Sequence, residues 1–212
     1  MSRTNPRRQP LTRERIVAAA LSLADREGGK AVTMRRVGAE LHVEAMSLYH
    51  HVRDREDLLD GIAEAMVQTG IPVPGEGEPW RDIVSAFACG IRATAHQHPG
   101  AFQVVGLRPL HSREAKLTIS RLLSALEATG LPPDLAVTAY RVAAAYARGF
   151  ALSELAGLTL GIGVEVPGEL ASFAASLTRS TEETFVSGLH VLLDGIAAQA
   201  PSTTTEDPNR CR

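Results

Sequence analysis

Three short helical segments, each introduced by a turn or a capping residue, fill the first 52 residues. Thr12 precedes the segment RERIVAAALSLADREG, in which apolar residues recur at helical spacing and a Gly-Gly pair supplies the stop. Thr33 precedes the segment MRRVGAEL, and the segment EAMSLYHH follows after a turn at His42 and Val43. Two short helices joined by a turn, with a third in front to complete a small core, form a helix-turn-helix arrangement.

The rest of the chain is also helical in pattern, so the predicted fold class is all-α. Aromatic residues make up only 4% of the chain beside many Ala and Leu, which favours helices over sheet. A longer helix begins at the capping residue Asp54 and runs to Gly70, and the Pro- and Gly-rich stretch IPVPGEGEPW follows it. Further helices are expected at about 80–97, 99–107, 112–129, 133–156, 168–178 and 180–198.

These segments divide the chain into five parts. We expect a basic flexible arm (1–10), a helix-turn-helix domain (11–53), a connecting helix (54–70), a second helical domain (71–199) and a tail of disordered composition (200–212). The net charge of -2 is unevenly distributed, because residues 1–57 carry +3 and the remainder carries -5. Such asymmetry often marks where a polyanion docks, although solvated helix faces also produce it.

Several classes of protein are excluded by simple counts. No window approaches the roughly 18 apolar residues that a membrane span needs, and the basic N-terminus is followed by no signal-peptide segment. Cys89 and Cys211, the two cysteines, do not make a disulfide framework. We therefore expect a cytoplasmic protein with no membrane partner.

The third helical segment has the size and polarity that a DNA major groove about 12 Å wide requires. Val43 and Leu48 face the predicted core. The residues left for the groove side are Ala45, Met46, Ser47, Tyr49 and His50.

Basic and hydroxyl residues flank this segment. Thr33, Arg35 and Arg36 stand at the start of the preceding helix, where they face the phosphates, and Arg53 and Arg55 stand just beyond the third segment. Such arginines neutralise the charge of the DNA backbone, which supplies affinity but no sequence information.

The phrases LTRERIVAAALSLADREG, VTMRRVGAEL and VEAMSLYHHVRDREDLLD resemble the N-terminal domain of TetR-family transcriptional repressors, over residues 11 to about 67. Beyond Trp80 the helix lengths, the GLRP at 106–109 and the closing TFVSGLHVLLDGI resemble the ligand-binding and dimerisation domain of the tetracycline-repressor branch. The resemblance implies a repressor that binds a palindromic double-stranded operator as a homodimer and is released by a small organic effector.

The resemblance also assigns roles to individual residues. Arg35 corresponds to a base-contacting position, and Ser47, Tyr49 and Arg55 correspond to phosphate-contacting positions. Ala45 and Met46 fall where family members vary to choose operators, and apolar side chains there would read a thymine methyl group rather than form bidentate hydrogen bonds.

Three histidines in this region need separate interpretation. His42 occupies a turn position that is usually Gly, so we expect a left-handed backbone there at a cost of about 1 kcal/mol. His50 and His51 are adjacent and point roughly 100° apart on a helix, whereas ligand pairs sit three or four residues apart, so we predict no metal site. By the family's pattern, His50 donates to a phosphate and His51 packs at the end of the recognition helix.

The helices of the second domain have broad apolar faces. One side of such a face can pack in the internal core and the other against a second subunit, which favours a dimer. An effector pocket is expected between the helices around 80–107 and the helix at 133–156. Aromatic residues at helical spacing are more often core, and Arg141 is a further polar candidate. Arg148 has the alternative of pairing with Glu154 or with a carboxylate of a partner chain. The candidate pocket residues are Phe87, His98, Phe102, Val105, Leu107, Tyr140, Arg148 and Phe150.

The chemistry of the effector is constrained by one departure from the tetracycline-repressor branch. Val104 and Leu107 stand just before Arg108-Pro109, where that branch carries a metal-chelating His and a nearby hydroxyl. Apolar side chains do not ligate Mg²⁺. We therefore expect an apolar or mixed organic effector rather than a metal-tetracycline complex, and no cofactor.

An enzyme, a transcriptional activator and a helical adaptor are the alternative functions. An enzyme is disfavoured, because His96 and His98 are two residues apart and share no helix face, and no nucleophile, phosphate-loop or zinc-protease motif is present. A transcriptional activator of the same fold stays open. A helical adaptor that no longer binds DNA would lack basic and hydroxyl residues in the recognition segment. The residues Arg35, Ser47, Tyr49 and Arg55 argue against that function.

Overall fold

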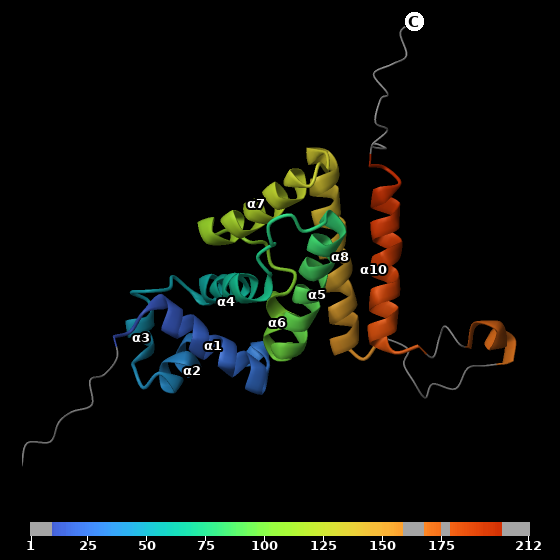
Figure 1. The fold of residues 1–212 in the computed structure, drawn as a ribbon. Coiled ribbons are helices and arrows are strands. Elements are labelled where there is room, and N and C mark those ends of the chain that lie inside the picture. Colours follow the sequence, from blue (N-terminus) through green and yellow to red (C-terminus); the bar gives the residue numbers. More distant parts are fainter. Residues whose placement is uncertain (1–9, 159–167, 175–178, 201–212) are drawn as a thin grey trace, which may run out of the picture.

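The computed structural model describes residues 10–158, 168–174 and 179–200 (Figure 1). Throughout these residues the secondary structure is helical, with no strand, so the predicted all-α class is confirmed. The proposed basic arm at 1–10 and the tail at 200–212 lie outside the described residues, apart from their inner ends. None of the described helices is long and apolar enough to cross a membrane.

The small N-terminal domain consists of α1 (Arg13–Glu27), the 3-10 turn η1 (Gly29–Ala31), α2 (Met34–Glu40) and α3 (Ala45–Leu48). The predicted caps are confirmed: Thr12 Oγ1 accepts from the backbone of Arg15 and Thr33 Oγ1 from the backbone of Arg36, both at 3.3 Å. These bonds satisfy amides that a helix leaves unpaired in its first turn. The core of the domain is made by Ile16, Leu23, Val32, Val37, Leu48 and Val52, all at most 2% exposed.

The third helix is shorter than the predicted EAMSLYHH segment. After Leu48 the chain tightens, because the amides of Tyr49 and His51 donate to carbonyls three residues back, Met46 and Leu48. Short i to i-3 bonds of this kind commonly close a helix. The tightening turns Val52 into the core, where it is 2% exposed.

The helix α4 (Arg55–Gly70) leaves the small domain and enters the larger one (Figure 1). Asp54 Oδ1 accepts from the Asp57 amide at 2.8 Å, which is the predicted cap. The helix packs closely on α1 at Gly61, where an added Cβ would lie 2.7 Å from Val17 Cγ2. Its other face packs on α5, α6 and α7.

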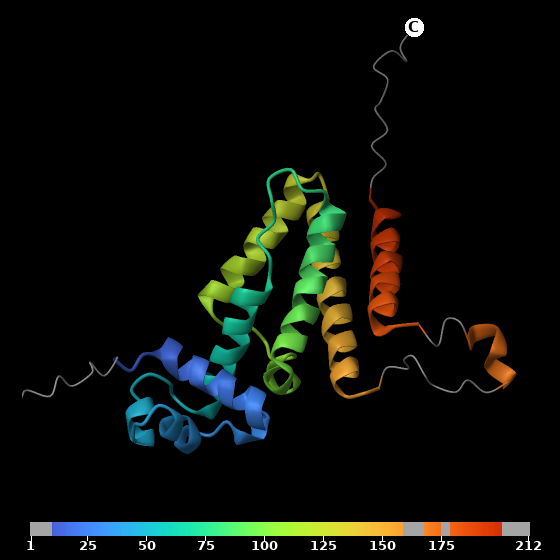
Figure 2. The ribbon, with the colours of Figure 1, turned by 60° about the horizontal axis from the view of Figure 1, so that its bottom comes forward.

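The larger domain contains α5 (Trp80–Gln97), α6 (Pro99–Val105), α7 (Arg113–Ala128), α8 (Pro133–Leu155), the 3-10 helix η2 (Gly168–Phe173) and α10 (Thr181–Ala197). Figure 2 shows α5, α8 and α10 as neighbouring long helices, with α10 against the far side of α8 from α5. The predicted helix at 168–178 is a 3-10 helix over its first residues, and 175–178 lie outside the described part.

Candidate DNA-binding surface and effector cavity

The turn between α2 and α3 has the geometry of a tight helix-turn-helix. His42 has φ +54°, which confirms the left-handed conformation predicted for it. The Val43 amide donates to the Gly38 carbonyl at 2.9 Å. A Cβ on Gly38 would stand 2.9 Å from the Val43 carbonyl oxygen, so only glycine allows α2 to approach the turn this closely.

The residues assigned to the groove side of α3 lie on the surface, and the core residue lies inside. Met46 is 73% exposed and Tyr49 is 47% exposed, whereas Leu48 is fully buried. His50 is exposed, Ala45 and Ser47 are half-buried, and Val43 is half-buried at the edge of the core. This face therefore presents an apolar side chain, a phenol, a hydroxyl and an imidazole to an incoming partner.

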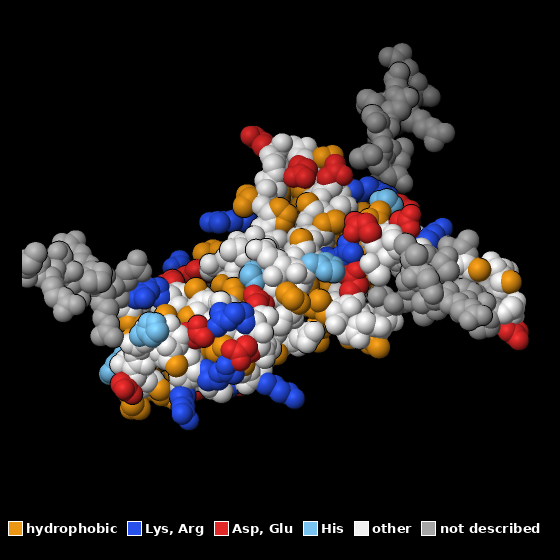
Figure 3. All heavy atoms as spheres, turned by 90° about the horizontal axis from the view of Figure 1, so that it is seen from below, with side chains coloured by type: hydrophobic (Ala, Val, Ile, Leu, Met, Phe, Trp, Pro, Cys, Tyr) orange, Lys and Arg blue, Asp and Glu red, His pale blue; other side chains and the backbone are white. Residues whose placement is uncertain are grey.

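The arginines around this face differ in how they are held. The side chain of Arg35 is exposed and makes no hydrogen bond or ion pair to any described residue. Arg36 forms an ion pair with Glu27 of α1, and the Arg53 side chain is 84% exposed beside Asp57. Figure 3 shows Lys and Arg side chains interspersed with acidic ones across the small domain. Arg35 is thus available for a ligand without breaking an existing contact.

The side chain of Arg55, predicted to contact a phosphate, is already hydrogen-bonded within the protein. Its Nε donates to the Val32 carbonyl at 2.8 Å and its Nη2 to the Gly29 carbonyl at 3.1 Å. Nη1 lies 3.3 Å from the Glu56 carboxylate, and the side chain is 39% exposed. Arg55 therefore joins the start of α4 to the turn that precedes α2.

The expectation that His51 packs at the end of the recognition helix is wrong. Its side chain is exposed, and its hydrogen bonds to described residues are made by the backbone: the amide donates to the Leu48 carbonyl at 2.9 Å and the carbonyl accepts from Arg13 Nη1 at 3.4 Å. The cause is the tight turn after Leu48, which brings Val52 rather than His51 into the core.

Arg13 and Asp57 connect the first turns of α1 and α4. The two guanidinium nitrogens of Arg13 donate to the two carboxylate oxygens of Asp57 at 2.8 and 3.1 Å. These hydrogen bonds, with the charge of Arg13 and the amide of Arg53, hold the pKa of the Asp57 carboxyl below its usual value. The bidentate geometry fixes the direction in which α4 leaves the small domain.

A second set of polar contacts joins the small domain to α6. His98 Nδ1 lies 2.6 Å from Asp25 Oδ2, and the Ala101 amide donates to Asp25 Oδ1 at 3.3 Å. Gly100 packs on the backbone of Ala24, where an added Cβ would lie 2.1 Å from the carbonyl oxygen. The small domain is therefore attached to the larger one through both α4 and α6.

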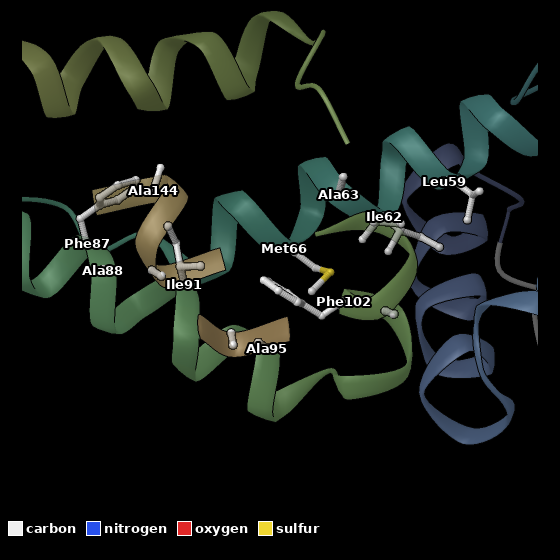
Figure 4. Packing of buried hydrophobic residues seen from close by; sticks show 14 of the residues in the cluster. Leu59, Ile62, Ala63, Met66, Phe87, Ala88, Ile91, Ala95, Phe102 and Ala144 are labelled. Atoms are coloured by element: carbon white, nitrogen blue, oxygen red, sulfur yellow. The ribbon is translucent and has the colours of Figure 1, made fainter. Parts of the chain in front are cut away.

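An apolar cavity, open to solvent on one side, lies among α4, α5, α6, α7 and α8, and the space between its walls together with the adjoining open solvent is about 550 Å³. Five of the predicted pocket residues line it, namely Phe87, Phe102, Val105, Tyr140 and Arg148. Figure 4 shows Met66 of α4 lying beside Phe102 of α6, with Phe87 and Ile91 further along α5. The other lining residues are Ala63, Met66, Val67, Gly70, Ile71, Ile91, Thr94, Gly106, Arg108, Leu110 and Ile119.

Three predicted residues do not line this cavity. The imidazole of His98 contacts Asp25, and Leu107 is 70% exposed because α6 ends at Val105 rather than at 107. Phe150 packs against Tyr146 and Phe185, with ring centroids 5.8 and 5.3 Å apart, so it belongs to the contact of α8 with α10. The alternative polar candidate Arg141 is exposed.

The pairing suggested for Arg148 with Glu154 is also absent, because another cation holds that carboxylate. Arg92 donates to both oxygens of Glu154 at 2.8 Å, and His96 Nε2 lies 3.2 Å away. Burial acts to raise the pKa of Glu154, but the hydrogen bonds and charge of Arg92 outweigh it and the pKa is lowered.

The sequence reasoning missed the wall that α4 contributes to the cavity. Ala63, Met66 and Gly70 line it from the same helix that starts at the helix-turn-helix domain. The spacing of three and four residues places Ala63, Met66 and Gly70 on one face of α4. The spacing does not indicate which other helices that face packs against.

This arrangement, a helix-turn-helix with an exposed recognition face attached to a larger helical domain, defines a DNA-binding regulator. The family model described as "Bacterial regulatory proteins, tetR family" matches residues 16–62, and that described as "Tetracyclin repressor-like, C-terminal domain" matches residues 71–163. The chain belongs to the TetR family of transcriptional regulators, whose members are regulators rather than enzymes.

Individual relatives agree with this assignment. An HTH-type transcriptional regulator of Saccharopolyspora erythraea is 36% identical over 61% of this chain. The match covers only 53% of the length of that relative. The class G tetracycline repressor protein of Vibrio anguillarum is 31% identical over 66% of this chain and 68% of its own length. The crystal structure of ActR from Streptomyces coelicolor in complex with actinorhodin has a TM-score of 0.77 and 25% identity, covering 92% of this chain and 99% of that one.

Proposed function

We propose that this protein is a ligand-responsive transcriptional repressor, which binds a palindromic operator as a homodimer and is released by a small organic effector. The observation that carries the proposal is the shared helix α4. Its first residue, Arg55, is bonded to the carbonyls of Gly29 and Val32 in the small domain, and its later turns line the cavity at Ala63 and Met66. A ligand that reshapes the cavity therefore acts on the element that orients the recognition helix.

The DNA contacts follow from the exposed face of α3 and the start of α2. Arg35, free of internal pairing among the described residues, reads a base, and the hydroxyls of Ser47 and Tyr49 bind phosphates. Ala45 and Met46 offer apolar contact to the groove. Thr33, Arg36, His50 and Arg55 complete the phosphate contacts, although Thr33 already caps α2 and Arg55 already binds two carbonyls.

Dimerisation is supported by the outer face of α8 and α10. On α10, Phe185, Leu189 and Leu193 are buried against the body of the protein, whereas Val191 is 69% exposed. Exposed residues on α8 include Ala145 and Gly149, which let another helix approach closely. Two copies joined through these faces would form a four-helix packing about a two-fold axis and carry two recognition helices.

The proposed switch needs only a modest free energy. A change of 10² to 10³ in operator affinity corresponds to about 3 to 4 kcal/mol, which the effector supplies by binding one arrangement of the dimer better than the other. The ligand-bound ActR structure and the tetracycline repressor relative support a response of this kind.

The test is selection of random duplex DNA by the purified protein at two salt concentrations. We expect one palindrome, with half-sites about one helical turn apart, and weaker binding at the higher salt. A salt-sensitive interaction without any motif would contradict sequence-specific reading and favour the adaptor. A reporter gene placed behind the selected operator then distinguishes repression from activation.

A further inference from the structure

The polar side chains that line the cavity are not equally engaged. Arg108 is engaged within the protein, because its nitrogens donate to Asp60 at 2.8 Å, to the Glu56 carboxylate at 2.8 Å and to the Glu56 carbonyl at 3.4 Å. The Thr94 hydroxyl donates to the Gly90 carbonyl at 2.8 Å. Both side chains therefore already have partners within the protein, and the charge of Arg108 is paired with two carboxylates.

The polar groups of Arg148 and Tyr140, in contrast, have no partner among the described residues. Both are half-buried, and neither the guanidinium of Arg148 nor the phenol of Tyr140 has a hydrogen bond or ion pair with any described residue. The two side chains project from α8 at a spacing of eight residues, which keeps them on one side of the helix. No carboxylate is among the described residues that line the cavity, and Glu154 is held by Arg92.

We propose that the effector is an apolar organic acid, whose anionic group binds the guanidinium of Arg148 while an acceptor on its body binds the phenol of Tyr140. This inference rests on the proposed function, since it takes the cavity to be the effector site. A partly buried guanidinium without a carboxylate costs solvation free energy that an anion restores. Its planar donors match a carboxylate or sulfonate in a bidentate way.

The rest of the lining sets the chemistry of the ligand body. The rings of Phe87 and Tyr140 lie 5.5 Å apart and form one aromatic wall, and Phe102, Val105 and Ile119 add apolar surface. Glu56 and Asp60 bind Arg108 on the α4 side and are not among the described residues that line the cavity. An aromatic ring system that bears one acidic group fits both parts of the cavity.

The experiment uses two fluorescent probes of the same skeleton, 8-anilinonaphthalene-1-sulfonate and the uncharged N-phenyl-1-naphthylamine. Their dissociation constants are measured on the full chain and on Arg148→Met, which keeps an unbranched apolar stem and removes the charge. Arg141→Met is the matched control, because Arg141 lies on the same helix but is exposed. Ala63→Phe fills the cavity from α4 and identifies binding within it. Circular dichroism checks that each variant is folded.

We expect Arg148→Met to weaken the sulfonate about tenfold or more and leave the uncharged probe within twofold, with Arg141→Met changing neither. Equal effects of Arg148→Met on the two probes, or no effect on either, would overturn the inference and leave the proposed function standing. Binding that is absent, or that Ala63→Phe does not reduce, would overturn both the inference and the assignment of the cavity as the effector site.

Discussion

Arg108 contacts Asp60 Oδ1 through both Nε, at 2.8 Å, and Nη2, at 2.7 Å. Arg108 stands in the loop after α6 and lines the cavity, whereas Asp60 lies in the first half of α4. The same guanidinium reaches Glu56 one turn earlier on α4. The rim of the cavity is thereby joined to the helix that enters the small domain.

Asp60→Ala should lower the free energy of unfolding by about 1 to 3 kcal/mol, because it removes a hydrogen-bonded partner from a largely buried guanidinium. Glu56→Ala is the matched variant, and it should cost less because the Glu56 side chain is 61% exposed while that of Asp60 is 22% exposed. Urea denaturation measures both. Equal losses would show that the buried contact with Asp60 is no more important than the exposed one.

Arg35→Ala should weaken binding to the selected operator by about 1 to 3 kcal/mol and flatten the preference at one base pair, with a smaller effect on random DNA. Arg36→Ala is the control from the next position, where the side chain is paired with Glu27, and it should weaken both DNAs alike. Fluorescence anisotropy with the two duplexes gives the comparison. Loss of the same size on both DNAs for Arg35→Ala would remove its base-reading role.

Arg55→Ala should reduce stability as well as DNA affinity, since it removes the Arg55 donor from the Val32 carbonyl and leaves the Gly29 carbonyl with the Val32 amide alone. We expect a loss of about 1 to 3 kcal/mol in the free energy of unfolding. Arg53→Ala, at a side chain that is 84% exposed, should change DNA affinity with little change in stability. Indistinguishable unfolding curves for Arg55→Ala and the parent chain would contradict the structural role.

The local features of the small domain were predictable because they depend on short-range chemistry. Thr12, Thr33 and Asp54 cap helices by bonding to amides three residues away, and that relation is visible in the sequence. The left-handed turn at His42 was predictable on another ground, because the family that the sequence resembles usually has glycine at this position.

Features that depend on packing between distant segments were less predictable. The exposure of Leu107 follows from α6 ending two residues early, and the contact of Phe150 with Phe185 depends on where α10 lies. The periodicity of a helix identifies its apolar face but not the partner of that face. For this reason the α4 wall of the cavity emerged only from the structure.

His42→Gly should stabilise the protein and His42→Val should destabilise it, each by about 1 kcal/mol, because φ is +54° at this turn. Glycine adopts this conformation without the clash of a Cβ, whereas a β-branched residue suffers more from it. Thermal melts of the three proteins should therefore rank glycine first, histidine second and valine last. A valine variant as stable as the glycine variant would refute the strain at this position.

Val191→Glu should convert the proposed homodimer into a monomer. Val191 is 69% exposed on α10, while its neighbours Leu189 and Leu193 are buried, so a glutamate there would place an unpaired charge in the proposed interface. Leu117→Glu is the control, because Leu117 is also exposed, at 45%, but belongs to α7 rather than to α8 or α10.

Light scattering at micromolar concentration should give about twice the chain mass for the parent protein and Leu117→Glu, and the chain mass for Val191→Glu. The monomer should also lose the high affinity for a full palindrome while keeping weak binding to a half-site, because only one recognition helix remains in each particle. A Val191→Glu protein that stays dimeric would place the subunit interface elsewhere on the larger domain, and a monomeric parent chain would contradict the proposed mode of operator binding.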